Sequence, residues 1–282
     1  MRTLLDCVPC IVRQALDAVR RTTADVQAQT RVLRQTLRHL AAADYASSPP
    51  ALAQVVHRAI RELTHGADAY RDMKDASNSL ALEILPALRE RVRTSAAPLE
   101  TAIRLAIAGN VIDAAITQHP DRDHVLAAVE HALAAPLDAD VDTFRAAIAR
   151  ARTILYLADN AGEIVLDRLL VEQLPAAKVT VAVRGTPVIN DATMADARVA
   201  GLTEIVEVID NGSDAPGTIL EDCSDLFRER FGNADLIIAK GQGNYETLSS
   251  SRGNVFFVLK AKCPVIAAHL GCRVGDLILK GP

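Results

Sequence analysis

Two short polar segments carry residue types that bind hard metal ions. Asp159 and Asn160 directly follow an apolar run, and Asp191 follows the next apolar run after a Gly/Pro loop. Carboxylate and amide oxygens are suitable ligands for Mg²⁺, Mn²⁺ or a similar divalent ion. If the two runs are adjacent parallel strands, their ends lie about 4.8 Å apart at one edge of a sheet, within reach of one cation. Each residue has an alternative role as a helix cap, but two such loops on consecutive strands favour a metal site.

A third segment combines glycines with a positive charge. Gly241 and Gly243 allow backbone N–H groups to approach an anion, and Lys240 supplies charge. The segment is not a Walker A loop, because no Gly-Lys-Ser/Thr follows, and Glu246 replaces the third glycine of a dinucleotide fingerprint. A phosphate cradle and a plain turn both remain open. Lys262, after the next apolar run, extends the anion site or is a solvated lysine.

One helical segment of the first half contains polar residues that interrupt an apolar pattern. Gly109 and Asn110 break the apolar stretch Leu105–Ile116, and Asp113 follows three residues after Asn110. Residues three apart share a helix face, so Asn110 and Asp113 could reach a cleft between the two halves of the chain. The alternative is a buried asparagine satisfied by local hydrogen bonds.

The five cysteines do not form a disulfide framework. Cys7 and Cys10 have Cys-x-x-Cys spacing, but a structural zinc site needs about four ligands and no second pair of cysteines or close histidines exists. We therefore interpret both as small buried thiols, and Cys223, Cys263 and Cys272 in the same way.

The segments that position these residues divide the chain into two halves. Residues 1–150 show apolar residues at helical spacing throughout, whereas short β-branched runs alternating with helical stretches follow residue 150. The predicted helices are Val8–Arg20, Val26–Leu40, Ser48–Gly66, Leu80–Val92, Leu99–Ile116, Val125–Ala134, Glu163–Leu174, Ala192–Val199 and Ser224–Phe231. The predicted strands are Thr153–Leu157, Lys178–Val183, Glu204–Ile209, Asp235–Ala239, Val255–Leu259 and Pro264–Ala267.

This alternation predicts an α/β fold. We expect a helical subdomain over residues 1–150 and, over 151–282, a Rossmann-like, mostly parallel sheet with helices on both faces. Ligands of such sheets bind at the carboxyl ends of the strands, where the polar segments lie.

Composition excludes several classes of protein. The chain has 282 residues, 50% of them apolar, and a net charge of −4, so no overall basic field attracts nucleic acid or membrane. No apolar run reaches the roughly 18 residues of a membrane span. Charges near the start of the sequence also argue against a signal peptide, so we expect a cytoplasmic protein.

Taken together, the motifs resemble the metal-dependent damage-control phosphatases (domain of unknown function 89), and in particular their stand-alone microbial branch. The resemblance covers essentially the whole chain. It rests on Cys7–Cys10, Gly109–Asp113, Asp159–Glu163, Asn190–Thr193, Lys240–Glu246 and Leu259–Pro264.

The resemblance implies a divalent-metal-dependent phosphatase that hydrolyses phosphomonoesters of small metabolites, either sugar phosphates or damaged phosphometabolites. The metal would be Mn²⁺, Co²⁺, Ni²⁺ or Mg²⁺. A metal- and phospholigand-binding sensor without catalysis is the alternative function.

The resemblance also assigns roles to individual residues. Asp159, Asn160 and Asp191 are the implied metal ligands. Lys240, Gly241, Gly243, Asn244 and Lys262 are expected to contact substrate phosphate, with Asn110 lining the same cleft. For the hydrolysis step itself we add our own hypotheses: Asp159 is a candidate phosphoryl acceptor, and Asp113 and Glu163 are candidate bases.

Overall fold

The computed structural model describes residues 1–63, 68–109, 122–251 and 253–282. Within these residues, seven strands form one sheet in the order β1-β7-β6-β5-β2-β3-β4. Neighbouring strands are parallel except for β6 and β7, which are antiparallel. The strands are β1 (Leu137–Ala139), β2 (Ile154–Leu157), β3 (Val179–Val183), β4 (Glu207–Asp210), β5 (Leu236–Lys240), β6 (Val255–Lys260) and β7 (Leu277–Lys280).

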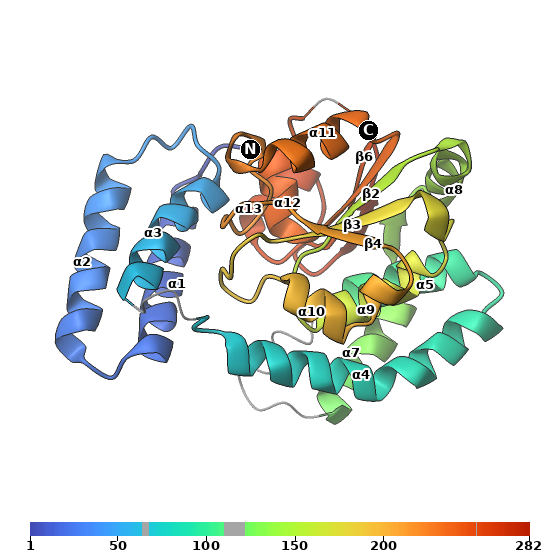
Figure 1. The fold of residues 1–282 in the computed structure, drawn as a ribbon, viewed down its shortest axis with the longest axis horizontal. Helices are drawn as coiled ribbons and strands as arrows, with labels where there is room; N and C mark the ends of the chain where they lie inside the picture. The colour runs from blue at the N-terminus through green and yellow to red at the C-terminus, as the bar shows by residue number, and fades with distance from the viewer. Residues whose placement is uncertain (64–67, 110–121, 252) are drawn as a thin grey trace.

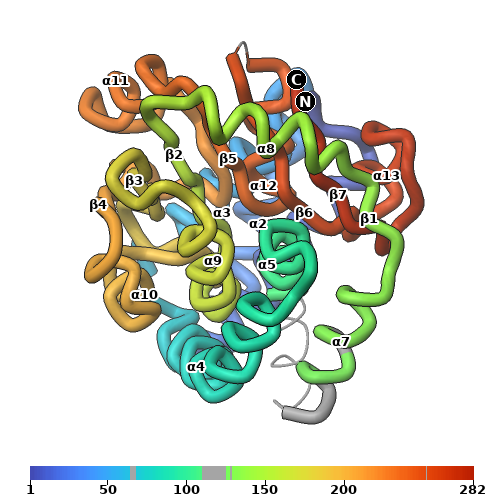
Figure 2. The backbone as a smooth tube through the Cα atoms, turned by 90° about the vertical axis from the view of Figure 1, so that its right-hand side faces the viewer, coloured from blue at the N-terminus to red at the C-terminus, as the bar shows by residue number. Residues whose placement is uncertain are grey.

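Helices cover both faces of this sheet, as Figure 1 shows. The helices are α1 (Cys7–Thr22), α2 (Val26–Ala42), α3 (Pro49–Leu63), α4 (Arg71–Thr94), α5 (Pro98–Ala108), α7 (Arg122–Ala134), α8 (Val141–Arg150), α9 (Glu163–Val171), α10 (Met194–Val199), α11 (Asp225–Asn233), α12 (Gly241–Leu248) and α13 (Pro264–Leu270). Figure 2 shows α4, α5 and α9 gathered on one side of the strands.

Alternate residues of the central strands enter two separate cores. Ile154 and Tyr156 of β2 pack into the core shared with α4, α5 and α9, whereas Leu155 and Leu157 pack into the core shared with α11, α12 and α13. Because both faces are covered, every residue of β2 and β5 is buried, which is typical of parallel sheets. β2 lies between β5 and β3, where the strand order reverses, and ligands bind at such a position in open α/β sheets.

Helices α1–α3 form a lobe beside the sheet, drawn in blue in Figure 1. They have a core of their own, which includes Ile11, Val19, Val32 and Val56. Arg58 and Arg61 of α3 form ion pairs with Asp214 in the loop after β4. The lobe is therefore fixed to the sheet side of the molecule near the carboxyl ends of the strands.

The predicted α/β class, the mostly parallel sheet and the N-terminal helices are confirmed. One predicted strand is wrong: Pro264–Ala267 belongs to helix α13, where Pro264 occupies the first turn, a position proline favours. Strands β1 and β7 were not predicted. The ends predicted at Gly66 and Ile116 lie outside the described residues.

The division at residues 1–150 and 151–282 stays a prediction. β1 lies in the sheet although it precedes residue 151, and α4 and α5 pack mainly against α9. Met73 near the start of α4 also contacts the core of α1–α3. Among the described residues, no helix is both long enough and apolar enough to cross a membrane.

Candidate metal and phosphate site

The loops after β2 and β3 are joined by their backbones. The Ala192 N–H donates to the Asp159 carbonyl at 2.8 Å, and the Ala161 N–H donates to the Asn190 carbonyl at 2.9 Å. Asn160 and Asp191 form a short antiparallel bridge between these contacts. The structure therefore brings Asp159, Asn160 and Asp191 together at the carboxyl ends of adjacent strands.

These three side chains are almost completely removed from solvent. Asp159 is 7% exposed, Asn160 6% and Asp191 4%. Burial raises the pKa of Asp159 to about 8, with added repulsion from Glu163 and Asp191. Burial also raises the pKa of Asp191, although Arg184 opposes this. Buried carboxylates that repel one another are stabilised by a bound cation.

Asn160 is held by the two acids that flank it. Its Nδ2 donates to Asp159 Oδ2 at 2.8 Å and to Glu163 Oε2 at 3.1 Å. Since the amide nitrogen serves both carboxylates, the amide oxygen Oδ1 is the atom that Asn160 can offer to a cation.

The donor set fits a hard divalent ion. It consists of two carboxylates and one amide oxygen, which are ligands that Mg²⁺ and Mn²⁺ accept, with water completing the shell. As the side chains lie, no group of three His, Cys, Asp or Glu residues in the described part of the chain could hold a metal ion. The proposed set contains only two such residues, so this observation does not exclude it.

Arg184, the first residue after β3, also belongs to the site, although no role was predicted for it. Its Nε donates to Asp191 Oδ2 at 2.6 Å, and its Nη2 lies 3.9 Å from Asp159 Oδ1. The side chain is 2% exposed. An arginine at the carboxyl end of a buried strand, seven residues before a candidate ligand, is the sequence signal that could have revealed this role.

The loop that presents Asp191 has an unusual backbone. Ile189 has a φ of 44°, in the left-handed region that β-branched residues rarely occupy. Arg61 from α3 donates to the Pro187 carbonyl at 3.0 Å, two residues before Ile189. Strain of this kind is common where a loop is held for function.

Lys240 does not lie where a phosphate-binding lysine was expected. Its Nζ donates to the Ala106 carbonyl at 2.9 Å, to Glu163 Oε1 at 2.6 Å and to Asp167 Oδ1 at 2.5 Å. These contacts use all three N–H groups of a fully buried ammonium. Burial by itself lowers the pKa of Lys240, but Asp167 and Glu163 outweigh this and raise the pKa.

The glycines after Lys240 allow close approach of other groups. Gly241 has a φ of 76°, and a Cβ there would lie 1.9 Å from Asp159 Oδ2. A Cβ on Gly243 would lie 2.4 Å from the Pro216 carbonyl oxygen. The predicted substrate residue Asn244 is also structurally engaged, since its Nδ2 donates to the carbonyls of Ala158 and Lys240.

A cavity of about 650 Å³ opens over the three predicted ligands. The residues that line it include Asp159, Asn160, Asp191, Gly243 and Lys262 among the polar or small ones, and Ile11, Pro49, Pro50, Ala53 and Val265 among the apolar ones. The exposed Lys262 forms no ion pair with the described residues, yet it is close enough to lower the pKa values of Asp159 and Asp191. Lys262 is thus a cation available to an anionic ligand.

Three thiols line the same cavity: Cys7, Cys10 and Cys263. All five cysteines are free, as expected. The prediction that they are buried holds only for Cys223, since Cys7, Cys263 and Cys272 are half-buried and Cys10 is exposed. Cys10 is exposed because it lies on the side of α1 that faces the cavity rather than the lobe core. Partial burial raises the pKa of the Cys7 thiol, which favours its protonated form.

Asn110 and Asp113 lie outside the described residues. Gly109, which precedes them, packs directly against Glu163: a Cβ on Gly109 would lie 3.1 Å from the Glu163 Cα. The end of α5 therefore lies against the start of α9, next to the predicted ligands.

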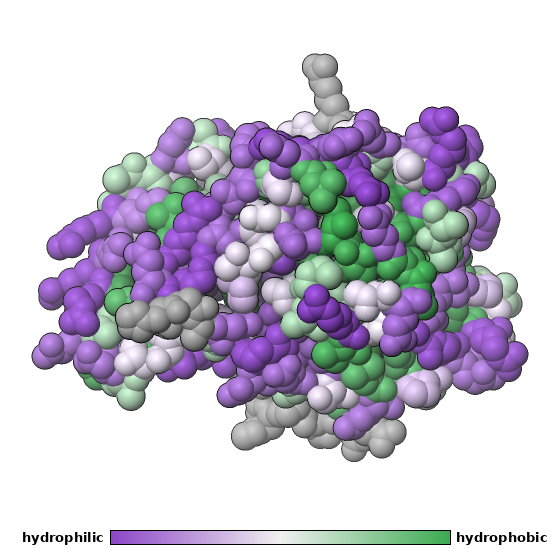
Figure 3. Space-filling view, in the orientation of Figure 1, coloured by the Kyte–Doolittle hydropathy of each residue, from purple (hydrophilic) through white to green (hydrophobic). Residues whose placement is uncertain are grey.

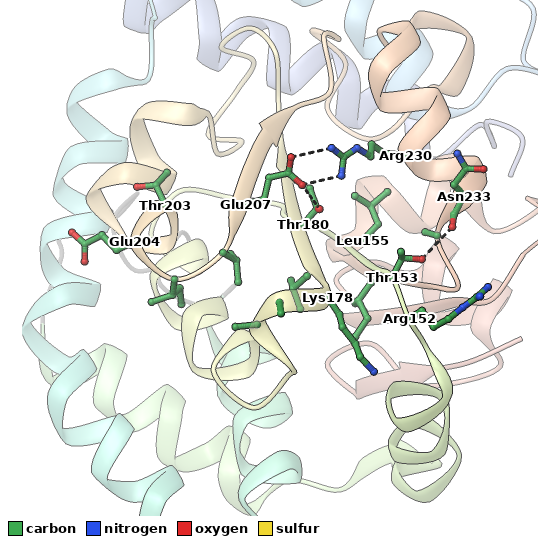
Figure 4. A pocket seen from close by; sticks show the side chains of 17 residues that line it. Arg152, Thr153, Leu155, Lys178, Thr180, Thr203, Glu204, Glu207, Arg230 and Asn233 are labelled. Atoms are coloured by element: carbon green, nitrogen blue, oxygen red, sulfur yellow. Dashed lines mark hydrogen bonds and ion pairs between the residues drawn. The ribbon is translucent and has the colours of Figure 1, made fainter.

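A second hollow, of about 550 Å³, lies at the amino ends of β2 and β3. Figure 4 shows its side chains: Arg230 pairs with Glu207, Glu207 accepts from Thr180, and Thr153 donates to the Asn233 carbonyl. Figure 3 shows apolar atoms exposed near β3 and β4 within a hydrophilic rim. Glu207 and Arg230 are paired with each other and half-exposed, so this hollow differs from the cavity lined by buried acids.

Comparison with known proteins identifies the family. The sequence model of one protein family, the damage-control phosphatase ARMT1-like domain, matches residues 3–278. The chain belongs to this family. An uncharacterised protein of Methanocaldococcus jannaschii is 36% identical, over 97% of this chain and 93% of that protein. A damage-control phosphatase of Archaeoglobus fulgidus is 34% identical, over 97% of both chains.

Solved structures support the same assignment to the damage-control phosphatase family. A crystal structure of a DUF89 family protein from Pyrococcus horikoshii matches with a TM-score of 0.90 and 32% sequence identity. The match covers 100% of this chain and 99% of that chain. The predicted resemblance to this family is therefore confirmed over the full length of the sequence.

Proposed function

We propose that this damage-control phosphatase family member is a divalent-metal-dependent phosphomonoesterase that acts on a small phosphorylated metabolite. One observation carries the proposal: Asp159, Asn160 and Asp191 are buried side by side at the edge of a cavity large enough for such a ligand. Family membership supports a phosphatase activity. The metal dependence rests on the chemistry of these three side chains.

Each residue has a distinct task in this proposal. Asp159, Asn160 and Asp191 would hold the metal, and Arg184 fixes Asp191 through its 2.6 Å contact. The bound ion would neutralise charge on the phosphoryl oxygens and polarise the phosphorus. Lys262 and the Gly243 backbone border the same cavity and would hold the remaining phosphate oxygens.

The nucleophile is either water or the Asp159 carboxylate. The contacts of Glu163 favour orientation over proton transfer, because Oε1 accepts from Lys240 and Oε2 accepts from Asn160. We therefore assign Glu163 to holding Asn160. The base that would activate a water molecule is left to Asp159, or to Asp113 on the segment after α5.

Hydrolysis of an aryl phosphate tests this function. The purified protein is stripped of metal and assayed for phosphate release with Mn²⁺, Co²⁺, Ni²⁺ or Mg²⁺, beside Asp159→Asn. We expect metal-dependent release by the wild type and more than about a hundredfold loss in Asp159→Asn, since a ligand and candidate nucleophile is lost. Full activity of the variant, or activity independent of metal, would contradict the proposal.

Substrate identity follows from a second screen. Sugar phosphates and damaged phosphometabolites are tested for phosphate release and, in parallel, for a rise in melting temperature. Stabilisation by a phosphorylated ligand without any phosphate release would instead support a sensor protein.

A further inference from the structure

The fully buried Lys240 contacts the proposed metal site through other residues. Its Nζ lies 2.6 Å from Glu163 Oε1, and the other oxygen of that carboxylate, Oε2, accepts from Asn160 Nδ2 at 3.1 Å. Asn160 Nδ2 also donates to Asp159 Oδ2 at 2.8 Å. A continuous chain of contacts thus runs from Lys240 through Glu163 to the side chains that would bind metal.

The rest of the Lys240 ammonium is anchored. One N–H donates to the Ala106 carbonyl at the end of α5, and another donates to Asp167, one turn after Glu163 on α9. Lys240 therefore ties the end of β5 to α5 and α9 at a single point. Such a charge is costly to bury unless its partners are well placed, and here each donor has an acceptor.

The orientation of Asn160 depends on this arrangement. An amide can present either oxygen or nitrogen to a cation, and only the oxygen is a metal ligand. Glu163 as a carboxylate accepts from the amide nitrogen and thereby directs Oδ1 away from itself. Lys240 donates to the other oxygen of Glu163, Oε1, and so holds this carboxylate in the rotamer that makes the contact with Asn160.

We propose that Lys240 is a positioning residue for metal binding, which acts through Glu163 to hold the Asn160 amide oxygen toward the ion. This inference rests on the proposed metal-dependent function. It differs from the expectation that Lys240 holds substrate phosphate, because all three donors are occupied and the lysine does not line the cavity.

The test compares Mn²⁺ affinity in variants with balanced charge. Lys240→Met alone would leave two carboxylates buried without their cation, so it is combined with Asp167→Asn. The double variant keeps the net charge of the cluster at −1, the value that one lysine, one glutamate and one aspartate give in the wild type. Asp167→Asn alone is the matched control, because it preserves the Lys240–Glu163 ion pair.

Mn²⁺ dissociation constants are measured by calorimetry and by the electron paramagnetic resonance signal of free Mn²⁺. We expect the double variant to bind Mn²⁺ about 10- to 100-fold more weakly, the usual effect of losing a partner of a metal ligand. Asp167→Asn should remain within roughly threefold of the wild type, because its amide oxygen still accepts from Lys240. At saturating Mn²⁺, the KM of the double variant for aryl phosphate should stay near that of the wild type.

A second variant interrupts the chain at its middle residue. Glu163→Gln is nearly isosteric, but it places an amide N–H against either Lys240 or Asn160, so we expect it to weaken Mn²⁺ binding as well. If circular dichroism shows that the double variant is unfolded, Glu163→Gln decides the question alone.

The outcomes separate this proposal from the proposed function. Wild-type protein that binds no Mn²⁺ would overturn both. Wild-type affinity for Mn²⁺ in the folded variants, with a raised KM for aryl phosphate, would overturn the positioning role and return Lys240 to direct phosphate binding. Weaker Mn²⁺ binding with an unchanged KM at saturating metal supports it.

Discussion

Two hollows of similar size lie at opposite ends of the same strands, about 650 Å³ at the carboxyl ends and about 550 Å³ at the amino ends. At the amino ends, Glu207 and Arg230 neutralise each other, with side chains 46% and 44% exposed. At the carboxyl ends, Asp159 and Asp191 are buried and have raised pKa values. The two hollows therefore differ little in volume. They differ in that only the hollow at the carboxyl ends is lined by buried acidic side chains.

This difference has an energetic meaning. An exposed ion pair contributes about 0–1 kcal/mol to stability and is easily lost without consequence. Buried carboxylates that repel each other destabilise the fold, and perturbed groups of this kind cluster at functional sites. Burial of the acidic side chains at the carboxyl-end cavity therefore lowers the stability of the fold, and binding of a cation there would offset this loss.

The largest contrast is expected from removing one acid at each end. Asp191→Ala takes away a proposed metal ligand and the 2.6 Å partner of Arg184, so we expect kcat/KM for aryl phosphate to fall more than about a hundredfold. Glu207→Ala removes only a half-exposed ion pair, so activity should stay within about twofold. Similar losses in both variants would show that the two ends are not functionally different.

A smaller effect should follow from adding one methyl group beside Asp159. The Cβ of Gly241→Ala would lie 1.9 Å from Asp159 Oδ2 and must displace it. We expect a loss of about 10- to 100-fold in kcat/KM, since misplacing a reacting group by about 1 Å has effects of that size.

Gly232→Ala in α11 is the matched control, because a Cβ there has nothing within 4 Å. It should leave activity unchanged and raise helix stability by up to about 1 kcal/mol, measured by urea unfolding. Equal activity of the two alanine variants would contradict the close approach of Gly241 to Asp159.

A still smaller effect concerns pH. The pKa of Asp159 is raised from 3.8 to about 8, so the folded protein without metal holds a proton that the unfolded chain releases. Between about pH 4 and pH 8 the unfolded state therefore binds fewer protons, and stability contributed by this group falls as pH rises. Mn²⁺ must displace the same proton, so its affinity should increase by up to about tenfold from pH 7 to pH 8.

Asp235, at the amino ends of the strands, has a pKa that is shifted in the opposite direction. The backbone N–H of Arg152 lowers the pKa of Asp235, whose contribution is present above 3.8 and is lost as pH falls. Asp235 therefore adds nothing to pH dependence between pH 7 and pH 8. Mn²⁺ affinity that does not change over this interval would contradict the raised pKa of Asp159.

The sequence was sufficient to predict most of the sheet, for identifiable reasons. β2, β3, β5 and β6 are continuous apolar runs between polar turns, the pattern of strands buried on both faces. Pro264–Ala267 is equally apolar, and so short a run fits either a strand or a helix. β1, of three residues, pairs with β7, and β7 also pairs with β6. Pairing between segments far apart in the chain cannot be predicted from a local sequence pattern.

Only those site residues that directly follow a recognisable strand could be predicted from the sequence. Asp159, Asn160 and Asp191 each follow a recognisable strand, so the sheet edge that they share could be inferred. Glu163 and Asp167, two acids one turn apart on an apolar helix, signal a buried partner. That this partner is Lys240, more than 70 residues away, depends on tertiary packing.

The proposed hydrolysis requires that one divalent ion binds among Asp159, Asn160 and Asp191. Anomalous X-ray scattering from crystals grown with Mn²⁺ tests it most directly. We expect a strong manganese peak within about 2.0–2.5 Å of oxygens from all three side chains. A peak elsewhere in the molecule, or none at this position in a protein that hydrolyses phosphate with Mn²⁺, would contradict it.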